Sequence, residues 1–402
     1  MNKYGSIYLK SKKEIPVLRF HPWVFSGAIK SKEGNPKDGD IVKVYDNRKN
    51  FLAVGHYYEG SIAVKLFAFE DIIPDGDFWK QKIAAAFAIR QQMNLTDNKE
   101  EGTNAYRLIH GEGDGLPGLI VDVYNQVVVV QFHAVGMYKV SHLIKDALIQ
   151  VLGDRIVAIY NKSSTTLPSN FAKTTENGYL WRSFEGNSAA IVENGNKFQI
   201  NWETGQKTGF FLDQRNNRAL LQQFSKDKKV LNAFCYSGGF SVYALLAGAK
   251  EVHSVDASAK AIDLLEENLA LNELQESNHK SYVGDVMKFL KEQEGENEQY
   301  DVIVLDPPAY AKTASKRHNA IQAYKRLNIA GLEHLKSGGV LFTFSCSQVV
   351  DNQLFYNTIT AAAIEAKRKV RVLHRLTQPA DHPVNIFHPE GNYLKGLVLY
   401  VE

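Results

Sequence analysis

From about residue 190 onward, short apolar stretches alternate with amphipathic ones, and this alternation constrains the fold more than any other feature of the sequence. The predicted strands begin near residues 229, 251, 281, 300 and 338, and helical patterns lie between them. Such alternation is typical of a doubly wound, mostly parallel sheet with helices on both faces. We therefore predict a Rossmann-like α/β domain over residues 189–402.

The residues before this domain show two other patterns. Residues 1–72 contain short strand-like stretches broken by Gly, Pro and Asp-Gly turns, which predicts a small β-barrel. Residues 73–188 mix helical and strand patterns, which predicts an α+β middle domain. Its elements are expected as a helix at 78–95, strands within 116–132, a helix near 137–152 and a strand at 155–161.

Composition limits the class of protein but leaves its partners open. The chain is 44% hydrophobic and 23% charged, which is typical of a folded, water-soluble protein. No apolar run reaches the roughly 18 residues of a membrane helix and no secretion signal is visible, so we expect no membrane association and a cytoplasmic location. The two cysteines are then expected as free thiols. Residues 1–70 contain 12 Lys or Arg against 7 Asp or Glu, an excess compatible equally with nucleic-acid binding and with an ordinary solvated surface.

A glycine turn and an acidic residue suggest a cofactor site. Gly238 and Gly239 follow the apolar stretch at 229–233 and precede a helical pattern, so backbone amides there can approach a ligand. Asp256 ends the next strand, 18 residues after Gly238, where doubly wound folds place a carboxylate on a ribose diol. The turn departs from G-x-G-x-x-G, which favours a ribose-bearing cofactor without a pyrophosphate.

Two more acidic residues follow predicted strands at the same edge of the sheet. Asp285 precedes a helical pattern, so it is equally well explained as a helix N-cap. Asp306 is followed by Pro307 and Pro308, which restrict the backbone and hold the carboxylate in one direction.

Cys346 follows the fifth predicted strand, between Ser345 and Ser347. A strand cysteine is commonly a small packing residue. Its place at the carboxyl end, with serine rather than aliphatic neighbours, instead predicts that its side chain faces the ligand crevice. We therefore interpret Cys346 as a nucleophile.

With these residues in view, the sequence resembles the RlmI-like class I methyltransferases, which form 5-methylcytosine in bacterial 23S ribosomal RNA with S-adenosylmethionine. The resemblance covers nearly the whole chain and includes the start of a PUA domain, a small RNA-binding barrel. It depends on six stretches: HPWVFSGAI, GQKTGFFLDQRNNR, NAFCYSGGFSVYA, LDPPAYAK, TFSCS and DHPVNIFHPEGNYLKG.

The resemblance implies a role for individual residues. Asp256 would bind the ribose hydroxyls of S-adenosylmethionine, and Asp285 its adenine amine. The remaining cofactor contacts would come from Phe210, Gln214, Arg215, Phe234, Ser237, Gly238, Asp306 and Pro307.

The implied chemistry needs a covalent nucleophile, because carbon 5 of cytosine is poorly nucleophilic. Cys346 would add to carbon 6, and a protonated Asp306 would neutralise the charge at nitrogen 3. The base that removes the carbon-5 proton is not identified. Related RNA cytosine-5 methyltransferases carry a second cysteine near the Asp-Pro motif, but this loop reads DPPAY.

Two alternatives remain. Guanine methylation needs no cysteine, although enzymes that methylate exocyclic amines place an aromatic residue directly after the prolines, where this chain has Ala309 and only then Tyr310. A non-catalytic RNA-binding assembly factor would have no use for an aimed carboxylate and a thiol. The spacing of His374, His382 and His388 does not suit a metal site, so no metal is expected. The expected partner is 23S ribosomal RNA, and a homodimer is compatible with the sequence.

Overall fold

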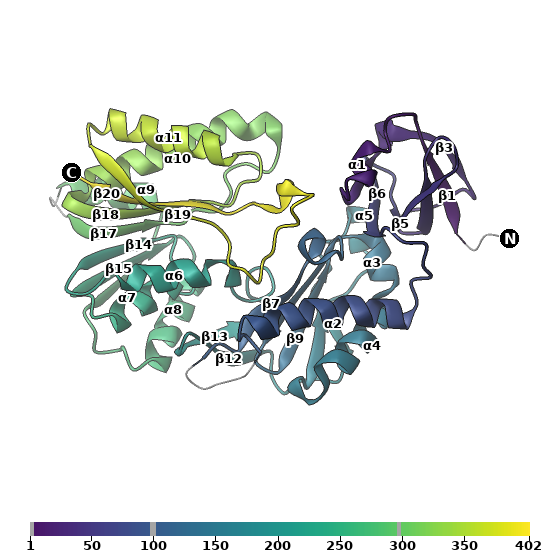
Figure 1. The fold of residues 1–402 in the computed structure, drawn as a ribbon. Coiled ribbons are helices and arrows are strands. Elements are labelled where there is room, and N and C mark those ends of the chain that lie inside the picture. Colours follow the sequence, from purple (N-terminus) through teal and green to yellow (C-terminus); the bar gives the residue numbers. More distant parts are fainter. Residues whose placement is uncertain (1–3, 97–101, 296–298) are drawn as a thin grey trace. The chain divides into compact units, whose positions relative to one another are not determined.

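The computed structural model describes residues 4–96, 102–295 and 299–402 (Figure 1). The chain forms two compact units. Unit 1 comprises Met1–Ile191, Ile200–Leu212 and Ala380–Gly391, and unit 2 comprises Val192–Gln199, Asp213–Pro379 and Asn392–Glu402. Within the described ranges, no helix combines the length and apolar character needed to cross a bilayer.

Unit 1 begins with a curled six-stranded sheet in the order β2-β6-β5-β4-β1-β3 (Figure 1). Its strands are β1 (Gly5–Leu9), β2 (Trp23–Phe25), β3 (Ile29–Glu33), β4 (Ile41–Tyr45), β5 (Phe51–Tyr57) and β6 (Ile62–Ala68), with the short helix α1 (Ile15–Leu18) between β1 and β2. Alternate residues of β4, Val42 and Val44, are fully buried, as expected for strands with one face on a core. The predicted small barrel is confirmed.

The rest of unit 1 is built around a five-stranded sheet in the order β11-β10-β9-β8-β7. Its elements are α2 (Gly76–Gln92), β7 (Ala105–His110), β8 (Leu119–Tyr124), β9 (Val127–Phe132), α3 (Val135–Lys139), α4 (Ser141–Leu152), β10 (Ala158–Asn161) and β11 (Gly178–Trp181). Asp75 is the N-cap of α2, because its side chain accepts a hydrogen bond from the backbone N–H of Phe78. The sequence patterns predicted α2, α4 and β8 to β10 but did not identify β7 and β11.

The barrel and the α+β layer share a hydrophobic core. Val54 and Phe67 of the barrel belong to the same buried cluster as Trp79 of α2. Gly136 of α3 lies against His56 so closely that a β-carbon there would be 2.2 Å from the imidazole. Both regions therefore fall in one compact unit, and the division of the chain at residues 72 and 188 stays a prediction.

Unit 2 contains a seven-stranded sheet in the order β16-β15-β14-β17-β18-β20-β19. Its strands are β14 (Lys229–Ala233), β15 (Glu251–Asp256), β16 (His279–Val283), β17 (Tyr300–Leu305), β18 (Leu335–Ser345), β19 (Val370–Leu376) and β20 (Lys395–Val401). β14 to β18 run parallel, and β20 runs antiparallel to both of its neighbours. The predicted doubly wound, mostly parallel sheet is confirmed.

Helices cover both faces of this sheet. Figure 1 shows α9 (Val286–Gly295), α10 (Arg317–Glu333) and α11 (Asn352–Glu365) on one face, and α6 (Arg215–Gln222), α7 (Gly239–Leu246) and α8 (Ala259–Leu271) on the other. The hairpin of β12 (Ser188–Glu193) and β13 (Asn196–Asn201) lies at the boundary of the two units in the sequence.

Candidate active site at the carboxyl edge of the unit 2 sheet

Three parallel strands of unit 2 bring candidate site residues to one edge. Ala233 of β14 is paired with Leu305 of β17, which is paired in turn with Thr343 of β18. Phe234 and Asp306 therefore follow adjacent strands at the same level, and Cys346 follows the next strand. The carboxyl ends of parallel strands form the ligand crevice of doubly wound sheets.

The loop after β14 has an unusual backbone that Asp256 holds in place. Phe234, Tyr236 and Gly238 all have positive φ, at 60°, 45° and 76°. Such a conformation is unfavourable for non-glycine residues and is concentrated at functional sites. The Asp256 carboxylate accepts hydrogen bonds from the backbone N–H of Tyr236 at 3.0 Å and of Ser258 at 2.9 Å. Asp256 thus lies where the sequence predicted it and also fixes the shape of the loop.

The remainder of this loop is tightly packed. A β-carbon at Gly238 would lie 2.6 Å from Cγ of Leu265, so glycine is required for packing as well as for its positive φ. The Ser237 carbonyl accepts a hydrogen bond from the Asn268 side chain at 2.8 Å. Cys235 is buried, and burial raises the pKa of its thiol well above the ordinary value, which keeps it protonated.

Asp285 is exposed at the start of α9. Its Oδ1 accepts a hydrogen bond from the backbone N–H of Lys288 at 2.9 Å, which is the helix-capping role that the sequence left open. After burial, the negative charge of Asp285 is the second cause that raises the pKa of Tyr310, in the loop that follows Asp306, to about 12. Its contact with adenine stays a prediction.

Asp306 is held by Gln214, whose Nε2 donates to Asp306 Oδ2 at 3.0 Å. Gln214 is itself oriented by Asn217, whose side-chain amide donates to Gln214 Oε1 at 2.6 Å. Burial, and then the negative charge of Asp213, raise the pKa of Asp306 from 3.8 to about 7. A substantial fraction of Asp306 therefore carries a proton at neutral pH.

Asp213 was not identified as a site residue in the sequence. Its Oδ2 accepts a hydrogen bond from the Tyr393 hydroxyl at 2.6 Å, within unit 2. Asp213 and Tyr393 both lie in stretches that carry the family resemblance, but nothing in the sequence shows that these stretches meet.

Arg215 and Phe210 differ in where the structure places them. Arg215 is buried at the first position of α6 in unit 2, directly after Gln214. Phe210 is buried in unit 1, where its backbone N–H donates to the Tyr124 hydroxyl at 3.1 Å. The structure therefore brings Gln214 together with Asp306 and describes Phe210 in the other unit.

A buried ion pair fixes the helix that follows Gln214. Arg218 donates two hydrogen bonds to the carboxylate of Glu193, at 2.8 and 2.7 Å. The Tyr243 hydroxyl donates to the same carboxylate at 3.0 Å. This bidentate pair connects α6 to β12 and to α7, so it positions Gln214 although it does not touch Asp306.

Cys346 is partly exposed, whereas Ser345 and Ser347 are fully buried. Successive side chains alternate along an extended chain, so the buried serines leave the cysteine on the opposite, open side. Ser347 Oγ donates to the Ala311 carbonyl at 2.7 Å and ties Cys346 to the loop that begins at Asp306. Ser347 thus holds the loop from inside.

The histidines of the last hairpin belong to different units. His374 lies on β19 in unit 2, whereas His382 and His388 lie on the 380–391 segment of unit 1. Among the residues outside the three undescribed gaps, no cluster of three or more His, Cys, Asp or Glu side chains is arranged to hold a metal ion.

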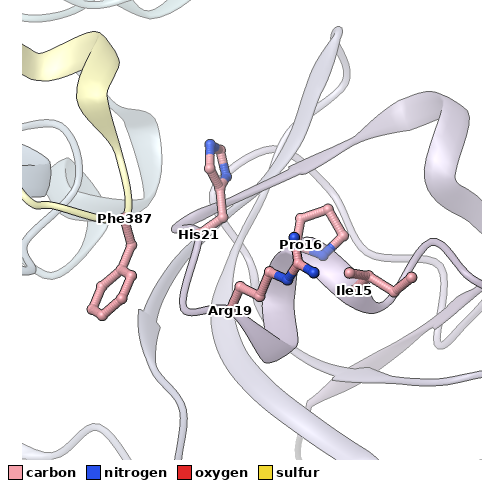
Figure 2. A pocket seen from close by; sticks show the side chains of 5 residues that line it. All are labelled: Ile15, Pro16, Arg19, His21 and Phe387. Carbon is pink, nitrogen blue, oxygen red and sulfur yellow. The ribbon is translucent and has the colours of Figure 1, made fainter.

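Unit 1 carries a separate surface hollow of about 340 Å³ beside α1. Figure 2 shows its lining side chains Ile15, Pro16, Arg19, His21 and Phe387. Phe387 comes from the 380–391 segment, which is held by a hydrogen bond from the backbone N–H of Arg107 to Asp381 at 3.0 Å. Phe20 packs on Phe387 with ring centroids 5.4 Å apart, and both rings are about half exposed.

The residues at the unit 2 edge fit a nucleoside cofactor bound without a pyrophosphate. A carboxylate ends the second strand, and the strained loop after β14 turns its backbone toward the same edge. This sheet and site are those expected of a class I methyltransferase. The S-adenosylmethionine-dependent methyltransferase family model matches residues 106–396, and a PUA-like domain model matches residues 7–69. The chain is therefore an S-adenosylmethionine-dependent methyltransferase with a PUA-like domain, and its cofactor is S-adenosylmethionine.

Relatives along the whole chain identify the family. Ribosomal RNA large subunit methyltransferase I of Aeromonas salmonicida is 38% identical over 98% of this chain and 98% of its own. The Vibrio vulnificus enzyme of the same name is 38% identical over 99% of each chain. The crystal structure of SMU.776 complexed with SAH covers 98% of this chain and 99% of its own at a TM-score of 0.85 and 24% identity, which shows a shared fold. The chain belongs to the RlmI-like methyltransferase family.

Replacing Asp256 with alanine is expected to weaken S-adenosylmethionine binding by about 1.5 to 3 kcal/mol, the range for hydrogen bonds to a charged group. The variant also loses two backbone hydrogen bonds that shape the 234–238 loop. Calorimetric titration of the full-length protein measures the effect, with Asp263→Ala, an exposed aspartate on α8, as the matched control. Unchanged affinity in Asp256→Ala would remove this residue from the ribose site.

Proposed function

We propose that this methyltransferase forms 5-methylcytosine in 23S ribosomal RNA through a covalent bond between Cys346 and the target base. The names of the relatives support ribosomal RNA of the large subunit as the substrate. The observation that carries the cytosine-5 assignment is the pairing of a partly exposed thiol with a carboxyl group of pKa about 7, on adjacent strand ends.

Cytosine needs both groups because its carbon 5 is poorly nucleophilic. The Cys346 thiolate adds to carbon 6, and the electron pair of the 5,6 double bond becomes available at carbon 5 as Asp306 gives its proton to nitrogen 3. S-adenosylmethionine supplies the methyl group that carbon 5 takes up. A base then removes the proton from carbon 5, Asp306 regains its proton from nitrogen 3, and the carbon–sulfur bond breaks to release Cys346.

The unit 1 hollow supports RNA binding by the barrel side of the chain. Exposed aromatic rings next to cationic side chains are typical of surfaces that stack single-stranded nucleobases. Phe387 supplies an exposed ring and Arg19 a cation at this hollow (Figure 2). The exposed ring of Phe20 packs on Phe387. We propose that an unpaired segment of the ribosomal RNA docks here.

The double substitution Arg19→Ala with Phe387→Ala is expected to weaken RNA binding about 10-fold or more, because a stacked base contributes roughly 1 to 3 kcal/mol. The dependence on salt should also decrease, by about one unit of log–log slope for the lost cation. Filter binding at several salt concentrations measures both effects, with Ile364→Ala and Arg371→Ala in unit 2 as an exposed matched control. Equal affinity in the two double variants would exclude the hollow as an RNA contact.

Substitution is a cleaner test than deletion of the barrel. Val54 and Phe67 complete the core that contains Trp79, so removal of residues 1–72 would open that core. The loss of RNA binding in such a truncation would then report unfolding.

Methylation mapping tests the proposed reaction. Ribosomal RNA from a strain that lacks this protein should lose one 5-methylcytosine in 23S ribosomal RNA. The wild-type protein should restore it in the purified RNA or in the ribosomal particle, and this comparison also identifies the substrate form. Loss of a methylguanine instead would overturn the cytosine assignment. The cytoplasmic location and a homodimer stay predictions.

A further inference from the structure

Lys395 is a buried cation beside the nucleophile. It is the first residue of β20, where the antiparallel register pairs it with Ser345 and directs its side chain to the face of Ser345. Beyond the end of β18, its Nζ reaches the backbone that follows Cys346. Only 3% of Lys395 is exposed. A lysine is seldom buried to this extent unless its charge has fixed partners.

Two carbonyl groups hold the ammonium of Lys395 in place. Its Nζ donates to the Ser347 carbonyl at 2.7 Å and to the Tyr393 carbonyl at 2.6 Å. The first carbonyl belongs to the residue directly after Cys346, so the charge is fixed at the backbone that carries the thiol. These bonds use two of the three N–H groups of an ammonium, which leaves one for a further acceptor.

The charged and titratable groups around Cys346 come from three elements. Lys395 of β20 and Tyr324 of α10 both interact electrostatically with Cys346. The pKa of Tyr324 is raised by burial, so Tyr324 is neutral. Asp351, which begins α11, interacts with Lys395. Lys395 supplies a cation to this group.

We propose that Lys395 is the positioning residue that makes Cys346 a thiolate, by holding a fixed ammonium beside the sulfur. This inference deepens the proposed function, because it assigns the source of the nucleophile on which that function rests. A nearby lysine ammonium is an established means of favouring a cysteine thiolate in proteins.

The protonation of Lys395 supports the inference. Burial lowers the pKa of Lys395 to about 8, and the charges of Cys346 and Asp351 act in the opposite direction. Lys395 therefore remains mostly an ammonium at pH 7. Because electrostatic interaction is mutual, a negative sulfur that stabilises the ammonium is stabilised by it to the same degree.

The test measures the reactivity of Cys346 in the full-length protein without RNA. Iodoacetamide alkylation is followed by mass spectrometry between pH 5.5 and 10, and the buried Cys235 serves as an internal reference. Wild-type Cys346 should reach half of its maximal rate at least about one pH unit below the value near 8.5 of an ordinary thiol. Wild-type Cys346 that reacts as an ordinary thiol would overturn the inference, whether or not any variant folds.

Two variants separate charge from packing. Lys395→Gln keeps hydrogen-bond donors but loses the charge, so alkylation at pH 7 should slow about 10-fold and approach the wild-type rate above pH 9. Lys395→Arg keeps a cation and should retain most of the shift. Binding of S-adenosylmethionine should be unchanged in both folded variants. An unchanged pH profile in Lys395→Gln, or equal slowing in both variants, would overturn the inference.

Failure of the Lys395 inference and failure of the proposed function give different experimental results. The alkylation profile needs no RNA and no knowledge of the target base. A shifted profile without a covalent RNA adduct would leave the Lys395 inference standing and remove cytosine methylation. A covalent RNA adduct together with the alkylation profile of an ordinary thiol would remove the Lys395 inference and leave cytosine methylation standing.

Discussion

Replacing Cys346 with alanine is expected to reduce methyl transfer by more than about 10⁴-fold, because a covalent mechanism loses its first step without the thiolate. S-adenosylmethionine binding should be unchanged, since Cys346 follows β18 whereas the expected cofactor loop follows β14. The fold should tolerate the change, because Cys346 is partly exposed and Ser345 and Ser347 keep their buried hydrogen bonds.

RNA that carries 5-fluorocytosine at the target position provides the direct measurement. Fluorine cannot leave carbon 5 as a proton does, so the methylated adduct should remain bound to Cys346 through denaturing electrophoresis. Its formation should require S-adenosylmethionine. Cys235→Ala is the matched control and should keep the adduct, because the Cys235 thiol is buried and protonated. Wild-type turnover in Cys346→Ala would return this residue to a packing role and favour guanine methylation.

Replacing Asp306 with asparagine is expected to lower turnover by about 10² to 10⁴-fold, the usual contribution of a positioned general acid or base. Asparagine can accept the hydrogen bond from Gln214 but cannot give a proton to nitrogen 3. In the wild type, turnover should fall as pH rises through about 7, where Asp306 loses its proton. This alkaline decline should be absent from the residual activity of Asp306→Asn.

Asp306→Asn should also stabilise the fold. A loss of turnover in a more stable variant cannot then be explained by damage to the structure. The pKa of Asp306 is about 7 when folded and 3.8 in an ordinary setting, so the folded state binds more protons between these values. Wild-type stability should therefore fall relative to the variant as pH rises from about 4 to 7, and the difference should level off above 7. We expect the difference to grow by about 4 kcal/mol between pH 4 and pH 8, measured by denaturant unfolding, because each pKa unit corresponds to about 1.4 kcal/mol. A less stable variant at pH 8 would contradict the raised pKa.

Sequence pattern alone predicted the main features of the unit 2 sheet and the strand-end positions of three candidate site residues. Asp256, Asp306 and Cys346 each end or directly follow an apolar strand, and parallel strands bring their carboxyl ends to one edge. Such positions are encoded locally, because strand ends are visible in the alternation of apolar and polar stretches. The family resemblance added Gln214, which the structure places on Asp306.

Other features depend on residues that are distant in the sequence, and only the tertiary structure shows them. Asp213 raises the pKa of Asp306, and Lys395 stands beside Cys346 because β20 returns antiparallel to β18. The sequence contains these side chains but not the strand register that brings them together, since register is set by packing across the whole sheet. The pKa values of these side chains depend on their burial and on their distance from other charges, so only the tertiary structure decides the protonation states of this site.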